Sequence, residues 1–143
     1  MDLMKKIKLG VLTSLVLISG CSTTLNKRFY TNPEDILFQQ WAAYTPDECS
    51  MTKVYGGVLA IVGNELIFDL KQQSARPFSP RLSPFQIFKK QIMKIEISDK
   101  KSWENKSIII QTYTGDYCFQ IKASDAEKIY EIILNWHNTE IFE

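Results

Sequence analysis

The stretch VYGGVLAIVGNELIFDL, residues 54–70, decides the fold. It holds two runs rich in branched apolar residues, 54–62 and 66–70, which a Gly-Asn pair separates. A glycine-containing pair between two such runs is typical of the tight turn of a β-hairpin. The adjacent glycines Gly56 and Gly57 indicate a β-bulge or a close approach of two backbones. The sequence therefore predicts an antiparallel hairpin here.

Strand-like sequence continues toward the C-terminus. Four further runs are rich in branched and aromatic residues or alternate apolar with polar ones: 85–88, 92–97, 108–113 and 117–122. The turn residues Thr114-Gly115-Asp116 separate the last two runs, which predicts a second hairpin. We therefore expect about six antiparallel strands.

The segment 72–84 is irregular, with three prolines and three serines. Loops of this length are often functional or simply solvated, and both interpretations stay open. Arg76 and Arg81 flank Phe78 in it, and we regard these three residues, with Trp103 in the charged turn 99–105, as candidates for contact with a partner. The basic pairs Lys89-Lys90 and Lys100-Lys101 are interpreted as solvated turns.

Two helices are predicted, one at each end of the strand region. In the C-terminal one, apolar residues fall three and four apart over residues 125–137, and Ser124 with Glu127 forms the pattern of a capping box. Asn32-Pro33-Glu34-Asp35 has the features of a helix start and predicts a short helix to about Ala43. Its apolar stripe would be Ile36, Leu37, Trp41 and Tyr44.

The N-terminus has lysines at positions 5, 6 and 8, an apolar run over 9–18, and then Ile18-Ser19-Gly20-Cys21. The run is too short to span a bilayer and matches the core of a signal peptide. The order resembles the lipobox of bacterial lipoproteins, although an ordinary signal peptide with an incidental cysteine is the alternative. The resemblance implies cleavage between Gly20 and Cys21 and a diacylglyceryl group on Cys21.

That resemblance divides the chain and locates it. Residues 1–20 would be removed, residues 21–31 would form a lipidated tether, and residues 32–143 would form one globular domain. Ser22 after the lipidated cysteine, in place of aspartate, implies the outer membrane facing the periplasm in Gram-negative lineages, and otherwise the outer face of the cell membrane.

Charge and cysteine content narrow the function. The whole chain has 17 basic and 16 acidic residues, and removal of the three lysines and one aspartate of residues 1–20 leaves 14 and 15. This balance is not that of a nucleic-acid binder, so membrane association would depend on the lipid. The remaining cysteines, Cys49 and Cys118, either form a disulfide in an oxidising compartment or are two buried side chains that never meet.

The order of strands followed by one helix is similar to the pleckstrin-homology-like superfold, in particular its small GRAM-like bacterial versions, over residues 51–138. The residues that carry this similarity are the glycine-rich hairpin 54–66, the Ile92-Met93-Lys94-Ile95 pattern and the turn at 115–119. It implies an α+β fold, a small curled antiparallel sheet or partly open barrel closed by the C-terminal amphipathic helix, with the short helix before it. It also implies binding rather than catalysis.

Catalytic chemistry has little basis in the sequence. The single histidine is His137, and the chain contains neither a Gly-x-Ser-x-Gly motif, nor a phosphate-binding glycine loop, nor a cluster of metal ligands. We therefore expect a non-enzymatic binding or scaffolding module of the cell envelope, without metal or cofactor, that meets an envelope protein. A carrier of lipid or another hydrophobic ligand is the alternative, and a small hydrolase is a third.

Overall fold

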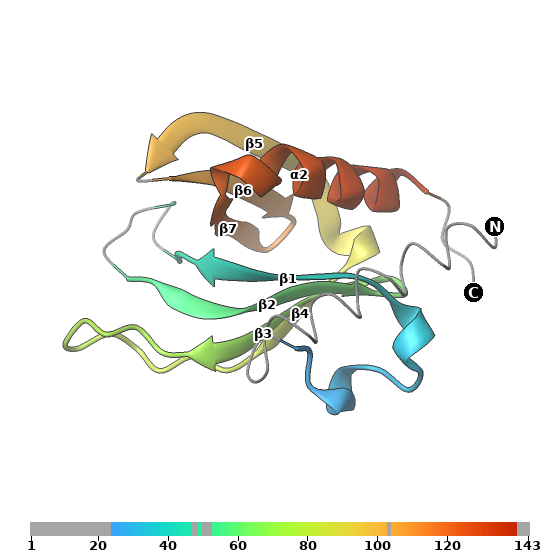
Figure 1. The fold of residues 1–143 in the computed structure, drawn as a ribbon, viewed down its shortest axis with the longest axis horizontal. Helices are drawn as coiled ribbons and strands as arrows, with labels where there is room; N and C mark the ends of the chain where they lie inside the picture. The colour runs from blue at the N-terminus through green and yellow to red at the C-terminus, as the bar shows by residue number, and fades with distance from the viewer. Residues whose placement is uncertain (1–23, 47–48, 50–52, 103, 140–143) are drawn as a thin grey trace.

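Seven antiparallel strands and one C-terminal helix make up the part of the chain that the structure, a computed structural model, describes: residues 24–46, 49, 53–102 and 104–139. The sheet order is β4-β3-β2-β1-β7-β6-β5 (Figure 1). The strands are β1 Ile36–Tyr44, β2 Tyr55–Val62, β3 Glu65–Gln72, β4 Phe85–Phe88, β5 Ile92–Ser102, β6 Asn105–Thr112 and β7 Gly115–Lys122, and the helix is α2 Ala123–Asn138. Three short 3-10 turns are η1 Lys27–Phe29, η2 Pro33–Asp35 and η3 Lys89–Gln91.

The predicted central hairpin is present as β2 and β3. The register between these strands shifts between Gly56 and Gly57, as expected of a bulge. A Cβ atom on Gly57 would lie 2.5 Å from the carbonyl oxygen of Asp69 and 2.9 Å from Cζ of Phe68. The glycine thus permits a backbone approach that no other residue allows.

The predicted N-terminal helix is wrong. Its start signal forms only the single turn η2, and the chain then continues as strand β1, which pairs with β2 along its whole length. Phe38, Ala42 and Tyr44 point to the same side of this strand and enter the core. Pairing with two neighbours satisfies the backbone of β1, which outweighs the local preference for a helix. The sheet consequently has seven strands, not six.

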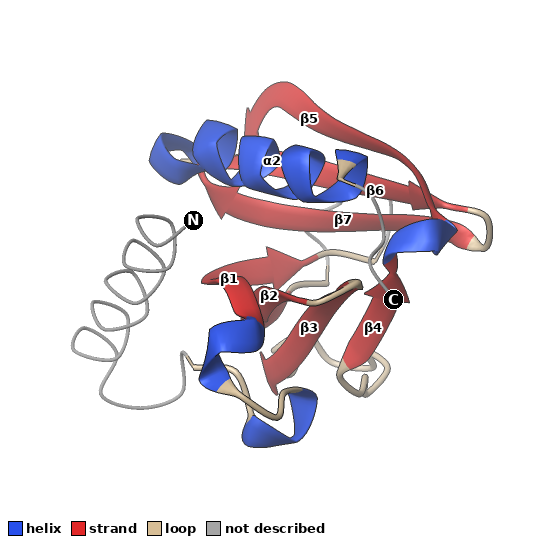
Figure 2. Ribbon diagram, turned by 90° about the vertical axis from the view of Figure 1, so that its right-hand side faces the viewer, coloured by secondary structure: helices blue, strands red, loops and turns tan. Residues whose placement is uncertain are grey.

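The sheet curls into two halves without closing into a barrel (Figure 2). Strands β1–β4 form one half and β5–β7 the other, and the register between β1 and β7 covers only Ala43 with Gln120 and Tyr44 with Phe119. Helix α2 lies along β5, β6 and β7 and buries four side chains, Ala126, Ile129, Ile133 and Trp136. The indole Nε1 of Trp136 donates to the carbonyl of Gly63 at 2.8 Å, so the end of the helix also contacts the β2–β3 turn.

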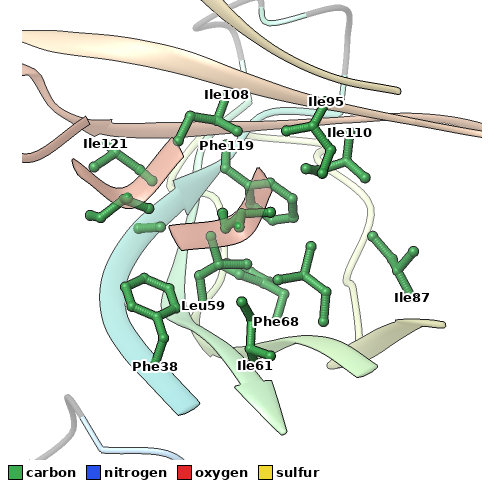
Figure 3. Packing of buried hydrophobic residues seen from close by; sticks show 14 of the residues in the cluster. Phe38, Leu59, Ile61, Phe68, Ile87, Ile95, Ile108, Ile110, Phe119 and Ile121 are labelled. Atoms are coloured by element: carbon green, nitrogen blue, oxygen red, sulfur yellow. The ribbon is translucent and has the colours of Figure 1, made fainter. Parts of the chain in front are cut away.

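Aromatic and branched side chains fill the space between the two halves and the helix (Figure 3). Five rings lie in mutual contact, with centroids of neighbouring rings 5.0 to 6.3 Å apart: Tyr44, Phe68, Phe85, Tyr117 and Phe119. Such ring pairs contribute beyond the burial of their area. This core comes from both halves of the sheet, so the halves fold as one unit.

The described part of the predicted tether packs on the domain instead. Residues 24–35, which we call the strap, cross the outer face of β1–β3. Leu25 is only 4% exposed and lies in a second apolar cluster with Ile36, Val58, Ala60 and Ile67. The backbone N–H of Leu25 donates to Oε1 of Gln39 at 2.9 Å. The folded domain therefore begins by residue 25, because an apolar side chain at that position covers the outer face of the sheet.

The start of α2 also differs from the predicted capping box. The helix begins at Ala123, directly after β7, and its N-cap residue Lys122 makes no side-chain capping bond. Glu127 contacts Nζ of Lys106 on β6 at 3.2 Å instead. The helix is held by its apolar face rather than by a local cap.

Candidate interaction surface

The irregular segment between β3 and β4 is a loop held in place by hydrogen bonds, which we call the tip loop (residues 73–84). At its base the side chain of Gln73 bonds both backbone groups of Leu82, with Nε2 donating to the carbonyl at 2.8 Å and Oε1 accepting from the N–H at 3.0 Å. The hydroxyl of Tyr55, whose side chain is fully buried, donates to the carbonyl of Pro80 at 2.6 Å. These bonds fix the two arms of the loop relative to the sheet.

The end of the tip loop presents one aromatic ring. The N–H of Ser79 donates to the carbonyl of Arg76 at 3.4 Å, Pro77 is the second residue of this turn, and Phe78 is the third with φ 63°. These are the features of a type II turn, whose third residue is normally glycine. Phe78 is nevertheless fully exposed. A bulky residue in this conformation costs on the order of 1–2 kcal/mol and buries nothing in return.

Two arginines flank that ring in the sequence. Arg76 and Arg81 are both exposed on either side of Phe78. Of the other basic residues near the loop in sequence, Lys71 is paired with Asp69, Lys94 is paired with Glu96 and Lys89 is buried, so the charge that the loop presents is that of its two arginines. The predicted group of Arg76, Phe78 and Arg81 thus lies together on one preorganised loop, with a charge that suits an anionic partner.

Lys89 was expected in a solvated turn, and this is wrong. Its side chain is 5% exposed, because η3 packs against the end of α2. Its Nζ donates to Oγ1 of Thr139 at 3.1 Å and lies 5.1 Å from the centroid of the Trp136 ring. Burial lowers the pKa of the Lys89 ammonium group. Lys89 is therefore part of the packing that joins the two halves, whereas Lys90 is exposed.

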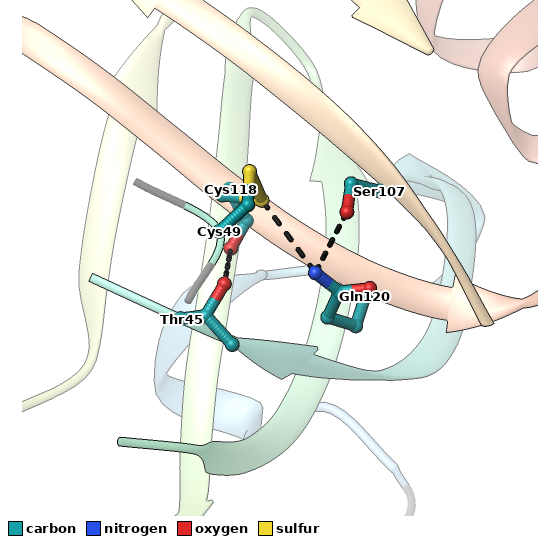
Figure 4. Close-up of a disulfide and its surroundings, with 5 residues drawn as sticks. All are labelled: Thr45, Cys49, Ser107, Cys118 and Gln120. Carbon is teal, nitrogen blue, oxygen red and sulfur yellow. Dashed lines mark hydrogen bonds between the residues drawn. A yellow bond between two sulfur atoms is a disulfide. The ribbon is translucent and has the colours of Figure 1, made fainter. Parts of the chain in front are cut away.

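Cys49 and Cys118 form a disulfide in the structure, with Cα atoms 5.3 Å apart (Figure 4). It connects the β1–β2 link to β7 beside the narrow junction of the two halves. Thr45 adds a hydrogen bond next to the β1–β7 pairing, because its N–H donates to the carbonyl of Cys118 at 3.0 Å. Gln120 is buried next to it, and its Nε2 donates to Oγ of Ser107 at 2.7 Å and contacts Sγ of Cys118 at 3.8 Å.

The remaining predicted site residues are not brought to this surface. Gly20, Cys21 and Trp103 lie outside the described residues. His137 is half-buried, and its Nε2 lies 3.1 Å from the carbonyl oxygen of Ile92. Within the described ranges, three or more metal-ligating side chains are nowhere grouped, and no described helix is long and apolar enough to span a membrane.

Three features of the surface could not be predicted from the sequence. The clamp joins Gln73 to a residue nine positions away, and the contact of Tyr55 with Pro80 joins residues 25 positions apart. Neither carries a local sequence signal, because both form only in the closed loop. The left-handed conformation of Phe78 runs against residue preference and could not have been inferred.

Comparison with known proteins adds information on the fold alone. The chain matches no family model, and no curated protein matches it in sequence. Among solved structures it is similar to the C-terminal domain of an unknown protein from Leishmania infantum, with a TM-score of 0.54 and 17% sequence identity over 73% of this chain and 84% of that one. At this identity the similarity concerns the architecture only.

Proposed function

We propose that this chain is a lipid-anchored protein of the bacterial cell envelope, whose folded domain is a non-enzymatic binding module. The anchor is Cys21, with residues 1–20 removed, and the membrane is the outer membrane facing the periplasm in a Gram-negative cell. The Cys49–Cys118 disulfide supports the location, because such bonds persist in oxidising compartments.

One observation carries the binding role: the tip loop holds an exposed aromatic ring between two arginines on a fixed base. What sets Phe78 apart from other exposed apolar side chains is its left-handed backbone conformation, because such strain is concentrated at functional sites. The carrier alternative is less favoured, because the five-ring aromatic cluster occupies the interior where a hydrophobic ligand would lie. The similarity to the pleckstrin-homology-like superfold remains a prediction.

The anchor is tested by mass analysis of the protein purified from membranes. We expect an N-terminus at Cys21 with the added mass of acyl chains, and a Cys21→Ala variant without that mass. The matched control is the double variant Cys49→Ala, Cys118→Ala, which should keep the acyl mass. A mature protein that retains residues 1–20, or that starts elsewhere, would show the anchor to be wrong.

The binding surface is tested by tryptic cleavage after Arg81, since Pro77 protects the bond that follows Arg76. In isolated envelopes an occupied tip loop should be cut several-fold more slowly than in detergent. A Tyr113→Arg variant places a comparable site in the exposed β6–β7 turn and should be cut equally in both. Equal cleavage after Arg81 in envelopes and in detergent would contradict a binding role for the loop.

A further inference from the structure

The strap limits how far the domain can stand from its anchor. Leu25 is buried on the outer face of the sheet, and only three residues separate it from Cys21. Four extended residues reach at most about 14 Å. If Cys21 carries the lipid, the strap-covered side of the domain therefore lies beside the membrane surface rather than at the end of a long tether.

The strap is fixed to the same strand from which the tip loop emerges. The backbone N–H of Asn26 donates to Oδ2 of Asp69 on β3 at 2.8 Å, and Asp69 is itself buried and paired with Lys71 at 2.9 Å. The tip loop starts at Gln73, four residues further along, which is about 13 Å in a strand. The residue of β3 that holds the strap and the base of the tip loop thus lie within a few residues of each other on one strand.

Both features lie on the half of the molecule away from α2. Figure 1 shows the 3-10 turns of the strap below β1–β3, and the tip loop extending to the left beyond the ends of β3 and β4 on that half. The same placement follows from the antiparallel order, because β3 ends and β4 begins where the loop leaves the sheet. A membrane beside the strap is thus within reach of the loop.

The chemistry of the loop suits a lipid surface. An aromatic ring fits the boundary between headgroups and acyl chains, while arginine guanidinium groups bind phosphates in two-pronged fashion. The tip loop itself, residues 73–84, contains Arg76 and Arg81 and no acidic residue, so no carboxylate of the loop would face anionic lipids. The strain at Phe78 also has an explanation there, because the left-handed backbone holds the ring outward where nothing in the domain covers it.

From these observations we infer that the tip loop is a second membrane contact: Phe78 enters the headgroup region of an anionic leaflet, and Arg76 and Arg81 bind lipid phosphates. The inference rests on the proposed lipid anchor at Cys21. Together, lipid and loop would fix the orientation of the domain, with the strap side toward the bilayer and α2 away from it.

The test places a tryptophan at the tip of the full-length processed protein. Phe78→Trp is reconstituted into vesicles of phosphatidylethanolamine with brominated phosphatidylglycerol, and the wild type supplies the background of its three tryptophans. The added emission should shift to the blue and be quenched by bromine. Tyr113→Trp, an exposed aromatic position in another turn, is the matched control and should show neither effect.

The charge contribution is measured in the same system. Replacing both arginines in the Phe78→Trp background, as Arg76→Ser and Arg81→Ser, should reduce partition of the loop into anionic vesicles roughly fivefold for each arginine removed. Vesicles of brominated phosphatidylcholine alone should give weaker quenching. Added salt should weaken the interaction in the anionic vesicles.

The outcomes separate this inference from the anchor. Acyl mass on Cys21 with an unquenched, water-like tryptophan at position 78 would overturn the membrane contact and leave the anchor standing. If Cys21 carries no acyl group, the unlipidated full-length protein is added to the same vesicles, where quenching at position 78 supports the contact and its absence overturns it. A photo-crosslinker at position 78 that gives a protein adduct in cells, and no lipid adduct, also overturns it.

Discussion

Phe78 is the residue where stability and function are in conflict. It occupies a left-handed backbone position that favours glycine, yet its side chain makes no buried contact. We therefore predict that Phe78→Gly raises the free energy of unfolding by about 1 kcal/mol, because it relieves the backbone strain without loss of packing. Denaturant unfolding of the two proteins measures this difference.

Phe78→Ala is the control for that substitution. It removes the same ring but keeps a Cβ atom at the positive φ, so its stability should stay close to that of the wild type. Loss of stability in both Phe78→Ala and Phe78→Gly relative to the wild type would show that the ring stabilises the fold, and would remove the argument that it is kept for binding.

At the scale of elements, the tip loop depends on one side chain at its base. Gln73 satisfies both backbone groups of Leu82, and these would lose their partners in a Gln73→Ala variant. We expect a loss of about 1–2 kcal/mol in the free energy of unfolding and faster cleavage after Arg81 in detergent. Denaturant unfolding and a time course of tryptic digestion measure the two effects.

The neighbouring exposed residue provides the comparison. Gln72→Ala removes a side chain of the same kind at the end of β3 and should change neither quantity appreciably. Equal effects of Gln72→Ala and Gln73→Ala would mean that the loop is held by the prolines and by Tyr55, and not by the amide clamp.

Strands joined by short turns could be predicted from the sequence, and β1 could not. The six predicted strands and the C-terminal helix are confirmed, because tight turns and the change from a two-residue to a 3.6-residue period are local signals. In β1 the residues Asn32–Asp35 do start a helical turn, and Phe38 and Ala42 have spacing that suits either a helix or a strand. What decides is pairing with β2 and β7, which is not encoded locally.

The candidate surface was predictable to a similar extent. Its position followed from the prolines and serines of 72–84, and the group of Arg76, Phe78 and Arg81 from their order in the chain. The clamp, the left-handed turn and the buried state of Lys89 were not predictable. The contact of Lys89 with Thr139 joins positions 50 residues apart, the clamp needs the loop to be closed, and the turn at Phe78 runs against the preference of phenylalanine.

For the whole molecule, the junction between the two halves of the sheet is the place where strand pairing is shortest. The register between β1 and β7 is two residue pairs long, and the Cys49–Cys118 bond lies beside it. The bond closes a segment with a sequence separation of 69 residues, for which the chain-entropy model gives a stabilisation of roughly 4 kcal/mol. The core and the Trp136 contact with Gly63 still connect the halves when the bond is absent.

Reduction should therefore weaken the domain without abolishing its fold. We predict that a reductant lowers the free energy of unfolding by about 4 kcal/mol and that amide exchange quickens first around Ala43 and Gln120, where the pairing is shortest. Denaturant unfolding and hydrogen exchange with and without dithiothreitol measure both effects. The double variant Cys49→Ala, Cys118→Ala should match the reduced wild type and be insensitive to the reductant. Unfolding midpoints that coincide for the oxidised and reduced wild type would mean that the core alone holds the halves together, and that the bond records an oxidising environment without contributing to stability.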